Sequence, residues 1–202
     1  MPPHHGLMLR SSEAVAEKPT NPRRLPGVVG VWVFIGADSV IFALLFLSYM
    51  QDRRKAPAAF EASSNTLNYN LGGHNTLILL TSSWLVALGA IAARRGELAR
   101  AHRLLLGGVL TGCAFVVSKL IEYAEKFAIG ITPVTGAFFT WYFTMTGLHL
   151  LHVVAGTGLL TYLWIKSRRT VNISTAECVA SYWHLVDLLW IVLFPLLYLV
   201  KG

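Results

Sequence analysis

Charged residues are scarce in this chain: Asp, Glu, Lys and Arg make up 13% of its 202 residues, whereas apolar residues make up 54%. The mean hydropathy of +0.56 excludes an ordinary soluble domain. A helix needs about 20 residues to cross about 30 Å of hydrocarbon, and five apolar runs approach or exceed this length. They occupy residues 27–50, 76–93, 104–123, 136–165 and 179–200. Because backbone groups in hydrocarbon must pair internally, we predict an all-α polytopic membrane protein, a bundle of five transmembrane helices.

Cysteine is also scarce, and the sequence has no internal repeat. The two cysteines, Cys113 and Cys178, fall inside or beside predicted spans and have no metal-binding spacing. We therefore expect neither a structural disulfide nor a cysteine metal site. Residues 1–26 contain no signal-peptide hydrophobic run, so we predict a flexible cytoplasmic tail at 1–26 and one transmembrane domain at 27–202. The missing repeat argues against an inverted-repeat transporter.

The net charge of +7 indicates membrane topology and not a nucleic-acid partner. Most basic residues lie before the first predicted span or in the connections that follow the second and the fourth. These residues are Arg10, Lys18, Arg23, Arg24, Arg94, Arg95, Arg100, Arg103, Lys166, Arg168 and Arg169. Because Lys and Arg accumulate on the cytoplasmic side of membrane proteins, we predict a cytoplasmic N-terminus and a periplasmic C-terminus.

The fourth and fifth predicted spans carry histidines within apolar sequence. At 100° per residue, His149, His152 and Gly156 fall within about 60° of one another on one helix face. Two imidazoles at this spacing are compatible with a metal site completed by His184, or with a b-type haem held between His149 and His184. No carboxylate or cysteine completes a metal set at useful spacing. We therefore favour hydrogen bonds to facing helices in a buried polar network.

The fifth span adds a carboxylate, Asp187, in a stripe with Trp183 and Trp190. An unpaired buried charge is costly, so we expect Asp187 to be hydrogen-bonded or neutral and to join His149, His152 and His184 in the network. A His–Asp pair also resembles part of a hydrolase triad. No serine or cysteine nucleophile stands in a recognisable elbow, which argues against a hydrolase.

Acidic residues in other predicted spans are candidate lipid or proton contacts. Asp38 has no cation within reach on its own helix, so it needs a partner on another helix or stays protonated. At the end of the third span, Glu122 is spaced for ion pairs with Lys119 and Lys126, and Glu125 follows one residue before Lys126. A proton-coupled transporter using Asp38 and Glu122 as a relay is therefore an alternative function.

Several segments resemble subunit III of the haem-copper oxidases, the family of cytochrome c and quinol oxidases. They are EYAE at 122–125, TGLHLLHVVAG at 146–156 and YWHLVDLLW at 182–190, in the order found in that family. The opening of the second span at 75–83 and the acid at Asp38 are also similar. The chain looks like the five-helix form, without the first two of seven helices. LPG at 25–27, Lys119 and the C-terminal LLWIVLFPLLYLV look most like the branch associated with bacterial nitric oxide reductase.

The resemblance implies a subunit that holds no haem or copper and is not itself an enzyme. The chemistry, with its haem and metal, would take place in a catalytic subunit I of the bacterial inner membrane. Subunit III would pack against subunit I, bind phospholipids and support proton uptake. Glu122 matches the family's membrane-embedded carboxylate and Asp38 its acid in the first of these five helices. The alternatives remain a b-type haem-binding membrane redox protein and the proton-coupled transporter.

Overall fold

The computed structural model describes residues 29–168 and 172–199 of the chain, and these are helical almost throughout. The helices are α1 (Val29–Lys55), α2 (Pro57–Ser64), α3 (Tyr69–Arg94), α4 (Leu98–Ala128), α5 (Ala137–Lys166) and α6 (Ile173–Phe194), and a π-helical turn η1 (Pro195–Leu199) continues α6. All except α2 belong to the five segments long and apolar enough to cross a membrane, α6 together with η1 forming the last. The all-α class is confirmed, as is the number of helices long and apolar enough to span a membrane among the described residues. The tail predicted at 1–26 lies outside the described residues.

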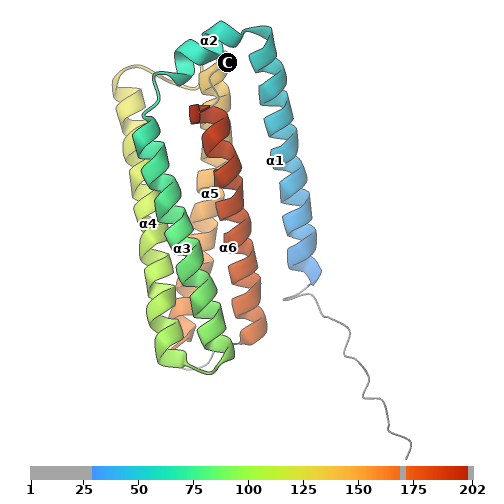
Figure 1. Cartoon of the computed structure of the whole chain (residues 1–202), viewed down its shortest axis with the longest axis vertical. Helices are drawn as coiled ribbons and strands as arrows, with labels where there is room; N and C mark the ends of the chain where they lie inside the picture. The colour runs from blue at the N-terminus through green and yellow to red at the C-terminus, as the bar shows by residue number, and fades with distance from the viewer. Residues whose placement is uncertain (1–28, 169–171, 200–202) are drawn as a thin grey trace, which may run out of the picture.

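Four of the long helices form a packed bundle, and α1 stands beside it (Figure 1). Helix α3 packs on α4 and α6, and α5 packs on the same two helices, so the four enclose a common core. Among the long helices, α1 packs mainly on α5 and α6. It contacts them far less than the four bundle helices contact one another, and most of its surface is exposed. Helix α2 lies across the end of the bundle where η1 also lies, between α1 and α3 (Figure 1).

Helices α3 and α6 begin before the predicted apolar runs, at asparagines whose side chains cap them. The Asn68 side chain accepts a hydrogen bond from the amide of Leu71 at 3.2 Å, and thereby starts α3 seven residues before the predicted span. Asn172 caps α6 in the same way, accepting from the amides of Ser174 and Thr175. The connection between α1 and α3 contains the short helix α2. Pro57, which has no N–H to leave unpaired, stands at the start of α2.

Glycines set the closest helix contacts inside the bundle. A Cβ added at Gly108 would lie 2.8 Å from the Val86 side chain, and one at Gly112 would lie 2.7 Å from the Thr157 hydroxyl. Gly108 and Gly112 therefore mark close contacts of α4 with α3 and α5 within this chain. Small residues permit such approaches in lipid, where helices associate through packing and hydrogen bonds. Gly30 on α1, by contrast, has no atom within 4 Å of an added Cβ.

Candidate functional site

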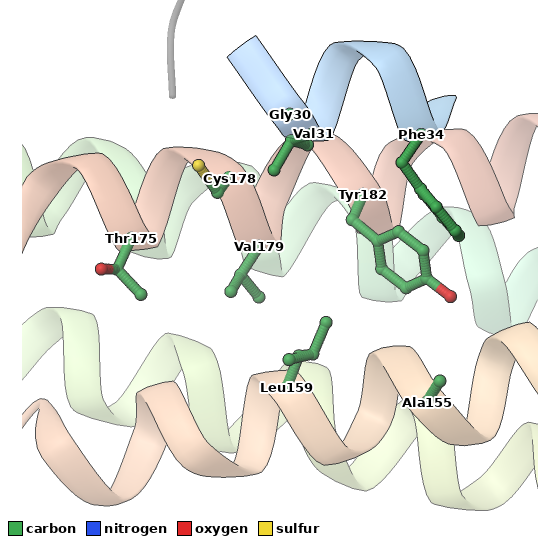
Figure 2. Close-up of a pocket in the computed structure, with 9 residues that line it drawn as sticks. All are labelled: Gly30, Val31, Phe34, Ala155, Leu159, Thr175, Cys178, Val179 and Tyr182. Atoms are coloured by element: carbon green, nitrogen blue, oxygen red, sulfur yellow. The ribbon is translucent and has the colours of Figure 1, made fainter. Parts of the chain in front are cut away.

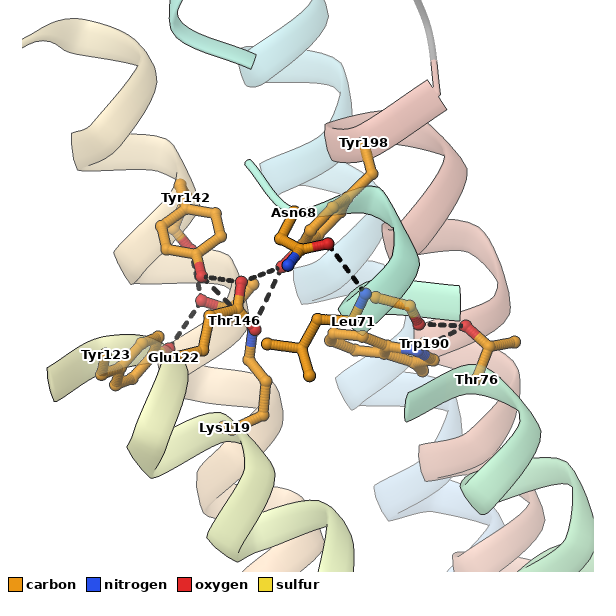
Figure 3. Close-up of polar contacts among 11 residues, drawn as sticks. Asn68, Leu71, Thr76, Lys119, Glu122, Tyr123, Tyr142, Thr146, Trp190 and Tyr198 are labelled. Atoms are coloured by element: carbon orange, nitrogen blue, oxygen red, sulfur yellow. Dashed lines mark hydrogen bonds and ion pairs between the residues drawn. The ribbon is translucent and has the colours of Figure 1, made fainter. Parts of the chain in front are cut away.

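A buried ion pair lies where α4, α5 and η1 meet. The Lys119 ammonium is 2.9 Å from Glu122 Oε2, and the two side chains are 0% and 2% exposed. Glu122 Oε1 accepts hydrogen bonds from the hydroxyls of Tyr142 at 2.7 Å and Tyr198 at 2.6 Å (Figure 3). The same hydroxyls accept from Lys119 at 3.3 and 3.2 Å. We call these four residues the Lys119 cluster.

Aromatic rings complete the surroundings of the ammonium. Lys119 Nζ lies 5.1 to 5.8 Å from the ring centroids of four residues. They are Tyr123, Tyr142, Trp190 and Tyr198. Such contacts stabilise a cation more strongly when it is removed from water. With its ion pair, hydroxyls and rings, the cluster is a closed structural unit that ties the C-terminal turn to α4 and α5.

The predicted pairing at the end of α4 is confirmed for Lys119 but not for Lys126. The Lys126 ammonium instead donates to the carbonyl oxygen of Thr66 at 2.7 Å, and so holds the connection between α2 and α3. Glu125 is exposed, whereas Glu122 is buried. The two acids therefore have different surroundings although they are three residues apart.

Asp38 has its partner on another helix, as expected from the sequence. Its Oδ1 lies 3.1 Å from His152 Nε2, which joins α1 to α5, and Asp38 is 5% exposed. His152 Nδ1 lies 2.8 Å from the carbonyl oxygen of Leu148. A carbonyl only accepts, so Nδ1 carries a hydrogen. Consequently the contact between Asp38 and Nε2 requires one proton, which sits on the carboxyl group or makes the imidazole cationic. The pair is a one-proton site.

Figure 2 shows an apolar cavity of about 500 Å³. Its lining residues Phe34 and Ala155 lie about one helical turn from Asp38 and His152, along α1 and α5. It lies between α1, α5 and α6. Its lining consists of Gly30, Val31, Phe34, Ala155, Leu159, Thr175, Cys178, Val179 and Tyr182. Tyr182 also donates its hydroxyl hydrogen to the carbonyl oxygen of His152 at 3.2 Å, so one residue joins the cavity wall to the proton site. A lining this poor in polar atoms suits a hydrocarbon chain.

The two histidines of the alternative haem site have different surroundings. His149 is fully buried, with its ring centroid 5.7 Å from that of Phe115 and 5.1 Å from that of Trp190. Neither of its nitrogens has a hydrogen-bond partner among the described residues. His184 is exposed on the outer face of α6, and its Nδ1 lies 2.6 Å from Ser83 Oγ on α3. A haem between the two imidazoles would need both of them to face one cavity, so this arrangement does not fit one.

Sequence reasoning missed the residues that complete these contacts. Tyr142 stands four residues before Thr146 and seven before His149, so the helical period of α5 could have indicated it. Ser83 is 101 residues from His184, and Tyr198 is 76 residues from Glu122. No local pattern connects residues so far apart. Ser83 also lies beside Asp187, but Asp187 has no contact with the second nitrogen of His184, so the three do not form a hydrolase triad.

Comparison with known proteins identifies the family. The family model described as cytochrome c oxidase subunit III matches residues 26–201, which is almost the whole chain. The chain belongs to the cytochrome c oxidase subunit III family. The buried pairs described above are therefore features of a multi-pass membrane subunit III.

Three curated relatives illustrate the similarity. The chain is 31% identical over 177 residues to the probable cytochrome c oxidase subunit 3 of Mycobacterium tuberculosis, covering 86% of this chain and 87% of that protein. It is 31% identical over 182 residues to the cytochrome bo(3) ubiquinol oxidase subunit 3 of Pseudomonas aeruginosa, covering 87% and 85%. With the cytochrome c oxidase subunit 3 of Synechocystis it shares 34% identity over 177 residues, covering 85% and 74%. None of these comparisons supports the nitric oxide reductase branch.

Proposed function

We propose that this subunit III is the non-catalytic membrane subunit of a bacterial haem-copper oxidase-type respiratory complex. It stabilises the catalytic subunit I in the inner membrane and supports proton uptake and lipid binding. The observation that carries this proposal is the family match across residues 26–201. Haem and metal belong to the partner in this proposal. The distribution of basic residues supports a cytoplasmic N-terminus and a periplasmic C-terminus.

The proton function is assigned to the Asp38–His152 pair. One proton is shared between a carboxyl oxygen and an imidazole nitrogen at the junction of α1 and α5. Ionisable side chains within a membrane span are costly. Their presence there therefore favours a functional role. The adjacent apolar cavity supports the lipid function, because an acyl chain would fill it. The exposed Glu125 is a candidate contact for a lipid headgroup at the end of α4.

Copurification tests the complex. We expect the tagged chain, purified in mild detergent from its own bacterium, to bring down a haem-containing catalytic subunit. The purified complex should consume oxygen when an electron donor is supplied, and nitric oxide consumption is measured in parallel. Purification of the chain alone would contradict the proposal. If the complex consumes nitric oxide but not oxygen, the oxidase assignment is replaced by the nitric oxide reductase branch predicted from the sequence.

The same preparation tests the two alternatives. A b-type haem protein requires a haem spectrum from the chain expressed without its partner. A proton-coupled transporter requires the isolated chain in liposomes to move a solute across the membrane when a proton gradient is imposed. The geometry speaks against a relay, since Asp38 pairs with His152 while Glu122 is closed in by Lys119 and two tyrosines.

Replacement of Asp38 tests the proton site. We expect Asp38→Asn to slow turnover of the complex at high pH, where protons are scarce, and to leave turnover at low pH nearly unchanged. The reason is that an amide has no proton to exchange at the position of the carboxyl group. Turnover is measured between mildly acidic and alkaline pH at constant subunit content. Glu125→Gln, an exposed acid outside the pair, is the control and should not change the pH profile. Equal loss at every pH would indicate a structural effect only.

A further inference from the structure

A line of polar side chains follows α6 from its first turns to the middle of the membrane span. Glu177, Ser181, His184 and Asp187 succeed one another at intervals of four, three and three residues, so they lie on the same side of the helix. Asp187 lies 14 residues after Ile173, the first residue of α6, which places it about 21 Å along the helix axis. Polar groups at this depth in hydrocarbon need partners in protein or in water held by protein.

The first three of these polar groups line a groove between α3 and α6. The groove has a volume of about 210 Å³ and is lined by Ala87, Ala90, Ile91, Arg94, Glu177, Ala180, Ser181 and His184. At the end where α3 finishes and α6 begins, Arg94 Nε and Glu177 Oε1 are 2.9 Å apart. The proposed topology places this end at the cytoplasmic surface. The groove therefore leads from that surface to the imidazole of His184, which is exposed.

A hydrogen-bonded chain continues from this imidazole to a buried acid. His184 Nδ1 lies 2.6 Å from Ser83 Oγ, and the Ser83 hydroxyl is also hydrogen-bonded to the carboxyl group of Asp187. Asp187 is 5% exposed, and its Oδ1 has no hydrogen bond among the described residues. A hydroxyl group can donate one hydrogen and accept another at the same time. Ser83 thus links an acid that is closed off from solvent to a base that lies in the groove.

We infer that Asp187, Ser83 and His184 form a proton-transfer chain, in which Asp187 stores a proton that reaches it from the α3–α6 groove. Asp187 is neutral in the loaded state, because a carboxylate held by a single hydroxyl is costly when it is buried. In that state the Asp187 hydrogen is donated to Ser83 Oγ, and the Ser83 hydrogen is donated to His184 Nδ1. The imidazole hydrogen is then on Nε2, since a neutral imidazole that accepts at one nitrogen carries its hydrogen on the other.

Release of the stored proton moves two hydrogens along the chain and one net proton out of it. The Asp187 hydrogen passes to Ser83 Oγ as the Ser83 hydrogen passes to His184 Nδ1, which leaves a carboxylate and an imidazolium. The imidazolium then loses its Nε2 proton to water in the groove. Loading uses the same bonds in reverse, so the ring does not have to rotate. The chain goes beyond the proposed function, because it lies between α3 and α6 and shares no residue with the Asp38–His152 pair.

Hydrogen–deuterium exchange at the acid tests the chain. Infrared spectra of the full chain in detergent are recorded after transfer into deuterated buffer. The carboxyl C=O band of Asp187 is identified by its loss in Asp187→Asn. We expect this band in the wild type, and we expect Ser83→Ala to slow its shift on deuteration about tenfold, because a positioned side chain strongly accelerates proton transfer. Ser83→Thr keeps a hydroxyl group and should exchange at close to the wild-type rate.

Thr81→Ala is the matched control, because the Thr81 hydroxyl donates to the Leu77 carbonyl oxygen of its own helix at 2.8 Å. It should leave the exchange rate unchanged, whereas His184→Leu should slow exchange as Ser83→Ala does. Unfolding in SDS verifies that each variant is folded. The inference is overturned by the absence of an Asp187 carboxyl band, by wild-type exchange in either folded variant, Ser83→Ala or His184→Leu, or by equal slowing in Thr81→Ala. The proposed function fails separately, if the wild-type chain brings down no catalytic subunit.

Discussion

Replacement of Lys119 with methionine is expected to lower the free energy of unfolding by about 3–5 kcal/mol. The methionine preserves the length of the side chain but leaves Glu122 as a buried carboxylate without its cation. The two tyrosine hydroxyls that remain can donate to one oxygen of Glu122, Oε1, and not to the other. The measurement is unfolding in mixed micelles with increasing SDS, followed by tryptophan fluorescence, since Trp190 stands beside the ammonium.

A matched pair at the surface separates burial from charge. Lys55 and Asp52 are also three residues apart and 2.7 Å from each other, but their side chains are 74% and 37% exposed. Lys55→Met should therefore leave the unfolding transition nearly unchanged, because water screens the exposed pair. The double variant Lys119→Met, Glu122→Gln should recover at least half of the lost stability, since it removes the uncompensated charge. Equal effects of Lys119→Met and Lys55→Met would contradict a structural role for the cluster.

The sequence was sufficient to predict which segments cross the membrane but not how long their helices are. Apolar runs report the part of a helix that lies in hydrocarbon. Helix α4, for example, was expected at 104–123 and extends over Leu98–Ala128. The additional turns contain polar residues, and backbone hydrogen bonds continue the helix there outside hydrocarbon. Pro57 was the available signal for α2, and the prediction did not use it.

The sequence predicted the residues of the candidate site and the Lys119–Glu122 pair within one helix, but not the pairs between helices. Helical periodicity indicates the residues that share a face, and it placed His149 and His152 together. The structure separates their roles, because His152 meets Asp38 on α1 while His149 is packed against Phe115 and Trp190. Which face meets which helix depends on the packing of the whole bundle. The requirement that Asp38 find a partner was physical, and it held; the identity of the partner needed the structure.

A side chain at Gly156 is expected to destabilise the protein, in contrast to one at Gly158, two residues later on α5. A Cβ at Gly156 would lie 2.8 and 2.9 Å from ring atoms of Trp183 and 3.2 Å from Tyr182. Trp183 is 1% exposed and fully enclosed, so its ring cannot move away without disturbing the core. We expect Gly156→Ala to lower the free energy of unfolding by about 1–3 kcal/mol, the usual cost of overpacking.

Gly158→Ala should have the opposite sign. A Cβ there meets no atom within 4 Å, and alanine is favoured over glycine inside a helix by about 0.5–1 kcal/mol. Both variants are compared in the same SDS titration, and the difference in sign is the test. Destabilisation by both would mean that the backbone of α5 needs glycine for its own geometry. Stabilisation by both would mean that Trp183 has room to shift. The approach of α5 to α6 would then not depend on a glycine at position 156.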